Sequence, residues 1–326
     1  MKSAQLILLT VLMGLLCSRS NQDISAQESP PTKPAGSQQP GQQLEGLGPV
    51  GTVTKIQDGF EFLEGPAMAP DGSIFFTDIP DNVIHRLRPE GDIERFLEPS
   101  AHANGLMYGG QGRLLACQMD GQLVSIDLET KDITILADQY QQKRFNACND
   151  LVIDKQGGIY FTDPRYSAPE PWPQVREAFY YRTADGQIVR LGDDLQAPNG
   201  IGLSPDEKTL YVIPSMSSQM MAYEVKRPGE LGSGRALCRL QQKGDAIDGG
   251  GDGMAVDVRG NLYITSSAGI QVFSPAGDPL GIIEVPETPA NCAFGGKDHK
   301  TLFITARRGL YQCDMPVAGL IPRVSP

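Results

Sequence analysis

The stretch "NDLVIDKQGGIYFTD" (residues 149–163) contains the pattern that decides the fold. A short apolar run, "LVI", is followed by a turn containing "KQGG" and then by "IYFTD", a run rich in aromatic and β-branched residues. Short runs of this composition, bounded by turn residues, are typical of β-strands. Glycine supplies the positive φ angles that tight hairpin turns need. The stretch therefore predicts two antiparallel strands joined by a turn.

The same pattern occurs six times from residue 52 onward. One residue in each second run is equivalent across the units, and the steps between these residues are 40, 45, 51, 52 and 40 residues. A period of about 40–50 residues with several strands per unit is typical of a β-propeller. Irregular two-sheet β folds are the alternative architecture, but they do not require a sixfold repeat. We therefore expect an all-β fold, a six-bladed β-propeller. The equivalent residues are Phe75, Leu115, Tyr160, Tyr211, Tyr263 and Phe303.

A ring of blades has to close, because unpaired edge strands are a liability. The first strand-like run, "TVTKIQDGF" (52–60), precedes the first complete unit. We expect it to add a strand to the last blade, beside "GLYQC" (309–313).

The N-terminus has the features of a signal peptide. Lys2 gives a positive start, and Leu6–Cys17 is an apolar run too short to span a bilayer, which needs about 20 apolar residues. Small residues before Gln27 suggest cleavage after Ala26. Lipid attachment at Cys17 is a weaker alternative, because Leu16 stands where a small residue is expected. The sequence thus predicts an exported protein, periplasmic or secreted, without a membrane span.

Three segments follow from this reading. Residues 1–26 form the signal peptide, and residues 27–51 are rich in Pro, Gly and Gln with few large apolar residues. Such a composition favours a disordered linker. Residues 52–326 form the propeller.

Charge and cysteine content narrow the function. The formal net charge is −11, which argues against nucleic acid as a partner, because phosphate contacts need clustered Lys and Arg. After cleavage five cysteines remain, an odd number without any C-x-x-C spacing, so a disulfide scaffold or a zinc site is not expected. Buried free thiols are the simpler interpretation, and one disulfide remains an alternative. The five are Cys117, Cys148, Cys238, Cys292 and Cys313.

Six oxygen-bearing side chains occupy equivalent places in the repeats, eleven or twelve residues before the aligned residue of the second run. They precede the first strand of each unit, which in a propeller is innermost and runs along the central channel. The six side chains should therefore converge at one mouth of that channel. In chain order they are Glu64, Asn104, Asn149, Asn199, Asp252 and Asn291.

Two carboxylates and four amides suit a hard dication. Calcium takes six to eight oxygen ligands at about 2.3–2.6 Å, and water completes such a shell. The three histidines match no zinc signature. One Asn-Gly motif alone would be an ordinary turn, but six polar residues in phase indicate a shared site. We expect one divalent cation in the channel, calcium first, with Zn²⁺, Mn²⁺ or Mg²⁺ as alternatives.

Several motifs are similar to those of one family. They are "EGPA" (64–67), "NDLVIDKQGGIYFTDPRY" (149–166), "APNGIGLSPDEKTLYV" (197–212), "DGMAVDVRGNLYIT" (252–265) and "NCAFGGKDHKTLFITA" (291–306). In this order and spacing they resemble the family of senescence marker protein (regucalcin), gluconolactonase and luciferin-regenerating enzyme. The resemblance implies a six-bladed propeller with one divalent cation in its channel, often calcium. It also implies lactone hydrolysis, the activity of the best-known bacterial members.

The resemblance extends to individual residues. It implies Glu64, Asn199 and Asp252 as metal ligands, and Asn149 as a ligand of the metal or of the substrate. Arg144, in "KRFNACND", lies near a position that often holds a substrate-contacting arginine.

These residues suggest a metal-dependent lactonase acting on sugar lactones. A cation would polarise the lactone carbonyl, and Asp252 would act as general base on a water molecule. Substrate hydroxyls would be bound by four side chains. Two alternatives remain open: a phosphotriesterase-like hydrolase on the same scaffold, resembling diisopropylfluorophosphatase, and a non-enzymatic exported propeller that binds a ligand. The four predicted substrate-binding residues are Asn104, Asn149, Arg144 and Asn291.

Overall fold

The structure is a computed structural model that describes residues 44, 46–243 and 249–321. The predicted signal peptide, with Cys17, and residues 27–43 of the predicted linker lie outside the described residues. The described residues belong to one compact unit. Its described part contains β-strands and turns and no helix.

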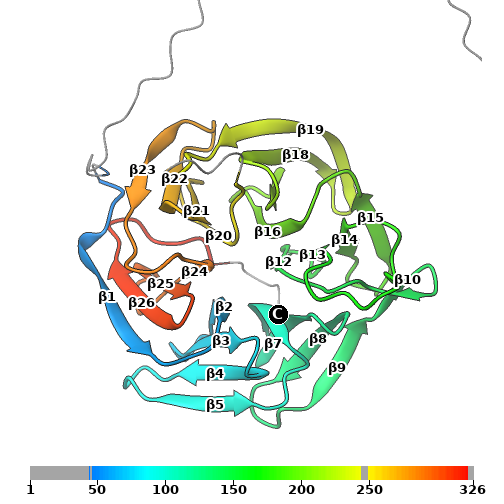
Figure 1. Cartoon of the computed structure of the whole chain (residues 1–326), viewed down its shortest axis with the longest axis horizontal. Helices are drawn as coiled ribbons and strands as arrows, with labels where there is room; N and C mark the ends of the chain where they lie inside the picture. Colours follow the sequence, from blue (N-terminus) through cyan, green and yellow to red (C-terminus); the bar gives the residue numbers. More distant parts are fainter. Residues whose placement is uncertain (1–43, 45, 244–248, 322–326) are drawn as a thin grey trace, which may run out of the picture. The chain divides into compact units, whose positions relative to one another are not determined.

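Six antiparallel four-stranded sheets surround a common centre (Figure 1). This confirms the predicted six-bladed propeller. In the first three blades the strand order follows the sequence, and the first strand is innermost. Blade 1 contains β2 (Leu63–Met68), β3 (Ile74–Asp78), β4 (Val83–Leu87) and β5 (Ile93–Leu97). Blade 2 contains β6 (Ala103–Gly110), β7 (Arg113–Gln118), β8 (Gln122–Asp127) and β9 (Ile133–Ala137). Blade 3 contains β12 (Leu151–Ile153), β13 (Ile159–Asp163), β14 (Ala178–Arg182) and β15 (Ile188–Gly192).

The next blades repeat this order, and a two-stranded hairpin lies between blades 2 and 3 in the sequence. Blade 4 contains β16 (Pro198–Leu203), β17 (Thr209–Pro214), β18 (Gln219–Arg227) and β19 (Glu230–Arg239). Blade 5 contains β20 (Met254–Val256), β21 (Leu262–Ser266), β22 (Gly269–Phe273) and β23 (Pro279–Ile283). Blade 6 contains β24 (Asn291–Gly295), β25 (Thr301–Ala306), β26 (Gly309–Asp314) and the N-terminal strand β1 (Val50–Asp58). The hairpin strands are β10 (Gln139–Tyr140) and β11 (Lys143–Arg144).

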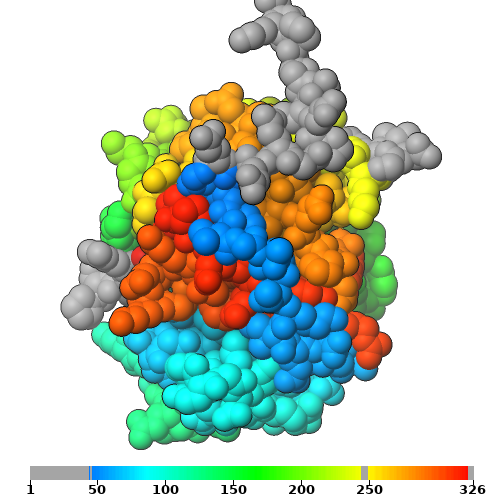
Figure 2. All heavy atoms as spheres, turned by 90° about the vertical axis from the view of Figure 1, so that its left-hand side faces the viewer, coloured from blue at the N-terminus to red at the C-terminus, as the bar shows by residue number. Residues whose placement is uncertain are grey.

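The pairing of β1 with β26 closes the ring, as the sequence predicts. The two strands are antiparallel, with Lys55 opposite Tyr311 and Asp58 opposite Gly309. Figure 2 shows the blue N-terminal strand lying against the red strands of the last blade. β1 begins at Val50, and the preceding Leu44 is buried against the core between blades 5 and 6. The packed part of the chain therefore begins before the expected boundary at residue 52, because apolar residues of the predicted linker join that core.

Apolar side chains fill the space between neighbouring blades. Six buried clusters occur in the described chain, and each combines side chains from two adjacent blades. The cluster between blades 1 and 6 includes Phe60, Phe76, Phe303 and Leu310. Such burial contributes about 25 cal/mol per Å² of apolar surface. The core is thus a ring of interfaces around the channel.

In every second blade, the hydroxyl group of a threonine on the second strand bonds to the backbone at the start of the innermost strand of the following blade. Thr77 donates to the carbonyl oxygen of Asn104 (3.0 Å), Thr162 to that of Asn199 (2.8 Å) and Thr265 to that of Ala290 (2.7 Å). These threonines belong to the "FTD" and "YITS" motifs that define the repeat. Their bonds hold the backbone beside the predicted site residues.

The C-terminal segment after β26 runs across one end of the channel. The amide of Leu320 donates to the carbonyl oxygen of Val256 (2.8 Å), and the amide of Gly319 donates to the carbonyl oxygen of His299 (2.8 Å). Figure 1 shows this red segment ending beside β20 on the inner side of the ring. Leu320 and Ile321 line a cavity of about 140 Å³ inside the channel.

The five cysteines expected in the mature chain are buried free thiols, as the simpler interpretation predicts. No helix long and apolar enough to cross a bilayer occurs in the described part of the chain.

Candidate active site in the central channel

The six predicted residues all lie where an innermost strand begins. Four are at the start of β2, β6, β16 and β24, and the other two lie two residues before β12 and β20. Five are buried, with 3–6% of their surface exposed. Asp252 keeps more accessible surface although protein atoms surround it on nearly all sides, as expected for a group that lines a narrow channel. The five buried residues are Glu64, Asn104, Asn149, Asn199 and Asn291.

Asn199 and Asp252 are in direct contact. The side-chain nitrogen of Asn199 donates to Oδ1 of Asp252 at 2.6 Å and lies 3.1 Å from Oγ of Ser215. The backbones of the same segments also meet, because Gly200 N–H donates to the carbonyl of Asp252 at 2.9 Å. Two predicted ligands that are 53 positions apart in sequence are therefore neighbours in space.

Glu64 belongs to the same group of side chains. The side chain of Asn291 is near enough to the carboxyls of both Glu64 and Asp150 to lower the pKa of each. Asp252 is close enough for its negative charge to raise the pKa of each of these two carboxyls. The channel thus contains three acidic groups within one electrostatic environment.

Burial changes the protonation of these acids. It is the main cause that raises the pKa of Glu64 well above its usual value, and the charge of Asp252 adds to it. Burial also raises the pKa of Asp252 to about 6, against the effect of the Asn199 amide, and that of Asp150 to about 7. No Lys or Arg of the described chain forms a salt bridge with any of the three. A cation between them would supply the missing positive charge.

These shifts predict how stability depends on pH without a metal. The folded protein holds a proton on Asp150 that the unfolded chain releases near pH 4. The contribution of Asp150 to the free energy of unfolding therefore falls as pH rises from about 4 through 7. We expect Asp150→Asn to gain stability relative to wild type across this window, by up to about 4 kcal/mol. Urea denaturation at several pH values, with chelator present, measures this difference. A constant difference would contradict it.

Asp150 was not among the predicted residues. Sequence reasoning took one polar residue per repeat, and Asp150 follows Asn149, the residue chosen in its repeat. The signal was nevertheless present, because four of the six predicted residues are followed by glycine, whereas Asn149 is followed by a carboxylate.

Those glycines allow the innermost strands to approach one another. A Cβ on Gly65 would lie 2.0 Å from the carbonyl oxygen of Asn104, and one on Gly200 would lie 2.6 Å from that of Asp252. A Cβ on Gly253 would lie 2.1 Å from the side chain of Asn291. No side chain fits at these positions, and this brings the polar residues of neighbouring blades together.

The segment between β13 and β14 reaches the site. The hydroxyl of Tyr166 lies 3.2 Å from the side-chain nitrogen of Asn199. Arg165 stacks on Trp172, 3.9 Å from the ring centroid, and Trp172 is half exposed. This segment therefore forms part of the rim of the channel, and Tyr166 is a site residue that the repeat pattern did not reveal.

The remaining predicted residues have more distant contacts. The guanidinium of Arg144, on β11, lies 3.4 Å from the carbonyl oxygens of Met119 and Asn146. The side-chain nitrogen of Asn104 lies 3.9 Å from the sulfur of Met119. Asn149 is held through its backbone, because its N–H donates to Thr162 (2.9 Å). The roles of these residues in substrate binding stay predictions.

The donor set fits a hard dication. Glu64 and Asp252 would supply carboxylate oxygens, and Asn149 and Asn199 would supply amide oxygens. In the structure Asn199 directs its NH₂ group to Asp252. Rotation of the amide by half a turn would direct its oxygen toward a cation bound by Asp252. These carboxylates form no salt bridge within the described chain, which is consistent with a cation bound between them.

Comparison with known proteins places the chain in a family. The model of the SMP-30/Gluconolactonase/LRE-like region matches residues 38–308. A gluconolactonase of Zymomonas mobilis is 33% identical over 281 residues, which is 78% of each chain. Rabbit (Oryctolagus cuniculus) regucalcin is 25% identical, covering 73% of this chain and 81% of its own. A solved gluconolactonase from Xanthomonas campestris is 29% identical with a TM-score of 0.75, covering 81% of this chain and 89% of that one. The chain therefore belongs to the SMP-30/gluconolactonase/LRE-like family.

Proposed function

We propose that the protein is a metal-dependent lactonase that opens sugar lactones by hydrolysis. The observation that carries this proposal is the meeting of Asn199 and Asp252 at 2.6 Å, within the same electrostatic environment as Glu64. A relative named gluconolactonase, 33% identical over most of both chains, supports the substrate class.

Glu64, Asn149, Asn199 and Asp252 would hold the cation, with calcium as the expected ion because all four donors are hard oxygens. Such a cation, when bound, would polarise the lactone carbonyl and stabilise negative charge on its oxygen.

Asp252 is the candidate general base. Its carboxylate would take a proton from the attacking water, and the proton would then pass to the ring oxygen as the carbon–oxygen bond of the lactone breaks. Burial raises the pKa of Asp252 to about 6 in the metal-free protein, and a bound cation would lower it again, so the carboxylate would be ionised and able to accept a proton at neutral pH. The hydrogen bond from Asn199 would hold this carboxylate in position.

The substrate would lie at the channel mouth. Asn104, Asn149 and Asn291 would bind its hydroxyl groups, and Arg144 would approach from the neighbouring β11. Tyr166 lies on the rim beside Asn199, so its ring would contact the substrate from above.

A panel of lactones tests this proposal. We expect hydrolysis of aldonolactones that is lost with a chelator and restored by added calcium, because the acidic cluster needs a cation to act. Acyl-homoserine lactones and organophosphates complete the panel, with pH-stat titration as the assay. Turnover of organophosphates alone would instead support a phosphotriesterase. No turnover of any substrate would support a ligand-binding propeller.

A further inference from the structure

A second group of metal-binding side chains lies outside the channel, where the ring closes. Asp78 ends β3, Asp81 lies in the turn after it, and His85 is on β4. They line a cavity of about 380 Å³ together with Gln57 and Phe60, which end the closing strand or follow it. In the described chain, these three side chains are close enough to one another to be ligands of a single ion.

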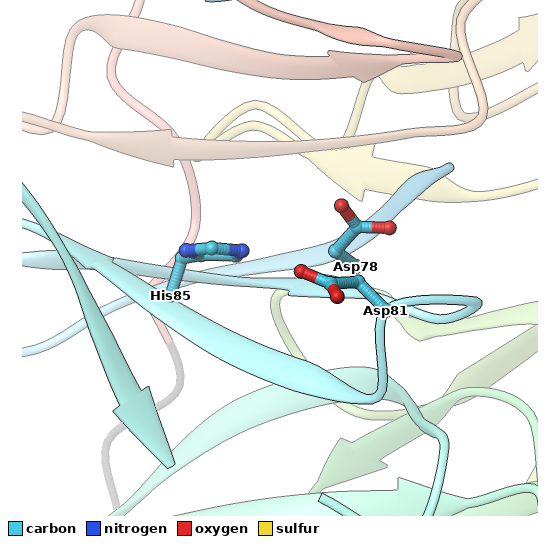
Figure 3. Close-up of side chains that lie close together, drawn as sticks. All are labelled: Asp78, Asp81 and His85. Carbon is cyan, nitrogen blue, oxygen red and sulfur yellow. The ribbon is translucent and has the colours of Figure 1, made fainter. Parts of the chain in front are cut away.

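The three side chains lie near one another, and small movements would bring their ligand atoms to the spacing of a bound ion. One ligand atom from each residue lies within 4.8 Å of the others. Figure 3 shows the carboxylate of Asp81 turned toward the imidazole of His85, with Asp78 beside Asp81 and its carboxylate turned away from the ring. Bonds of about 2.0–2.2 Å in a tetrahedral site place ligand atoms roughly 3.3–3.6 Å apart. The side chain of Asp81 lies in the turn and is 40% exposed, so its movement can shorten the distances between the ligand atoms to this spacing.

His85 is the observation that points to a ligand. The residue is only 6% exposed, and its buried Nε2 has no hydrogen-bond partner within the described structure. Its ring is stacked on Phe76 (5.2 Å between centroids) and meets the edge of Phe60 at 5.1 Å, which fixes its orientation. Leaving such a nitrogen unpaired costs about 1–3 kcal/mol, and a metal ion would satisfy it. Burial lowers the pKa of His85, which keeps the ring neutral.

The two carboxylates are held by different partners. Both oxygens of Asp78 accept backbone N–H groups, from Glu61 (2.9 Å) and Phe62 (3.0 Å), and each retains a free lone pair. Asp81 pairs with Arg95 at 2.6 Å, and Arg95 also bonds Glu98 at 2.8 Å. Arg95 would thus keep a partner if Asp81 turned toward an ion.

We propose that Asp78, Asp81 and His85 bind a divalent transition-metal ion such as Zn²⁺. Two carboxylates and one imidazole are ligands that zinc accepts, and water would take the fourth position. Asp78 also anchors the segment that leads from β1 into blade 1. The ion would therefore strengthen the closure of the ring and take no part in hydrolysis.

Zinc binding by paired variants tests this proposal. The Glu64→Gln/Asp252→Asn protein, in which the channel site is disabled, serves as the background, and equilibrium dialysis with metal analysis gives the stoichiometry. We expect one Zn²⁺ per chain, with affinity reduced at least tenfold by Asp81→Asn or His85→Gln. Zinc should also raise Tm in the background protein but not in these variants. Asp81 is exposed, so its replacement leaves folding intact.

A matched control comes from another His–Asp pair. His102 and Asp120 lie 3.1 Å apart on the surface, and no third ligand accompanies them among the residues that the structure describes, so Asp120→Asn should leave zinc binding unchanged. In the otherwise wild-type protein, Asp81→Asn should leave lactone turnover unchanged. Zinc stoichiometry and Tm shifts that are the same in the background, Asp81→Asn and His85→Gln proteins would overturn the proposal, as would no binding by the background protein. Neither result bears on the lactonase activity.

Discussion

Replacement of Asp252 by Asn is expected to lower kcat/KM for aldonolactones by at least about 10³-fold, since it removes the general base together with a charged oxygen of the metal site. Asn has nearly the same shape, and the bond to Asn199 can be kept after rotation of one amide. The folded state should therefore persist, and without metal it should be more stable, because the buried carboxylate with a pKa of about 6 is gone. Steady-state kinetics and thermal unfolding measure the two effects.

Glu64→Gln separates the base from the metal site. This variant also removes one buried negative charge, but it leaves Asp252 in place. Excess calcium should recover much of its activity, whereas the Asp252→Asn enzyme should stay inactive at every calcium concentration. If calcium restored both variants equally, Asp252 would be a ligand only. Wild-type turnover in Asp252→Asn would contradict the proposed mechanism.

Gly65→Ala is expected to lower the free energy of unfolding by more than about 3 kcal/mol, because two penalties combine. Its φ of +42° is unfavourable for alanine, and the added Cβ would lie 2.0 Å from the carbonyl oxygen of Asn104. Relief of this clash requires β2 to move away from β6, which displaces Glu64 beside it. Urea denaturation should show the loss of stability, and calcium titration should show weaker binding.

Gly112→Ala is the matched control. Gly112 has a φ of +68°, and nothing lies within 4 Å of the position of its Cβ. Alanine there should cost only about 1–2 kcal/mol, the backbone penalty alone. Equal losses in the two variants would mean that the close approach of β2 and β6 is not required.

Much of the architecture could be predicted because its signals are local and repeated. Turn residues and aromatic runs recur in each blade, so six weak patterns support one another. Because the repeats could be aligned, one equivalent position could be identified in every blade, and this is why Asn199 and Asp252 were predicted to lie together. Their roles as ligand and base stay predictions.

Features that break the repeat could not be found in this way. Asp150 replaces a glycine in one blade, and Tyr166 belongs to an insertion found in no other blade. The cavity beside His85 depends on where β1 leaves the last blade to enter the first. Such placements depend on the tertiary structure rather than on any periodic pattern.

The pairing of β1 with β26 also imposes an order of events during synthesis. β1 is made among the first described residues, and its partner strand is among the last. At about 5–20 residues per second, the roughly 250 residues between them take on the order of 10–50 s to translate. During that interval β1 has no β26 to pair with. Its sequence, "VGTVTKIQD", contains Lys55 and Asp58 and stays largely exposed in the finished ring, a composition that discourages premature association with other chains.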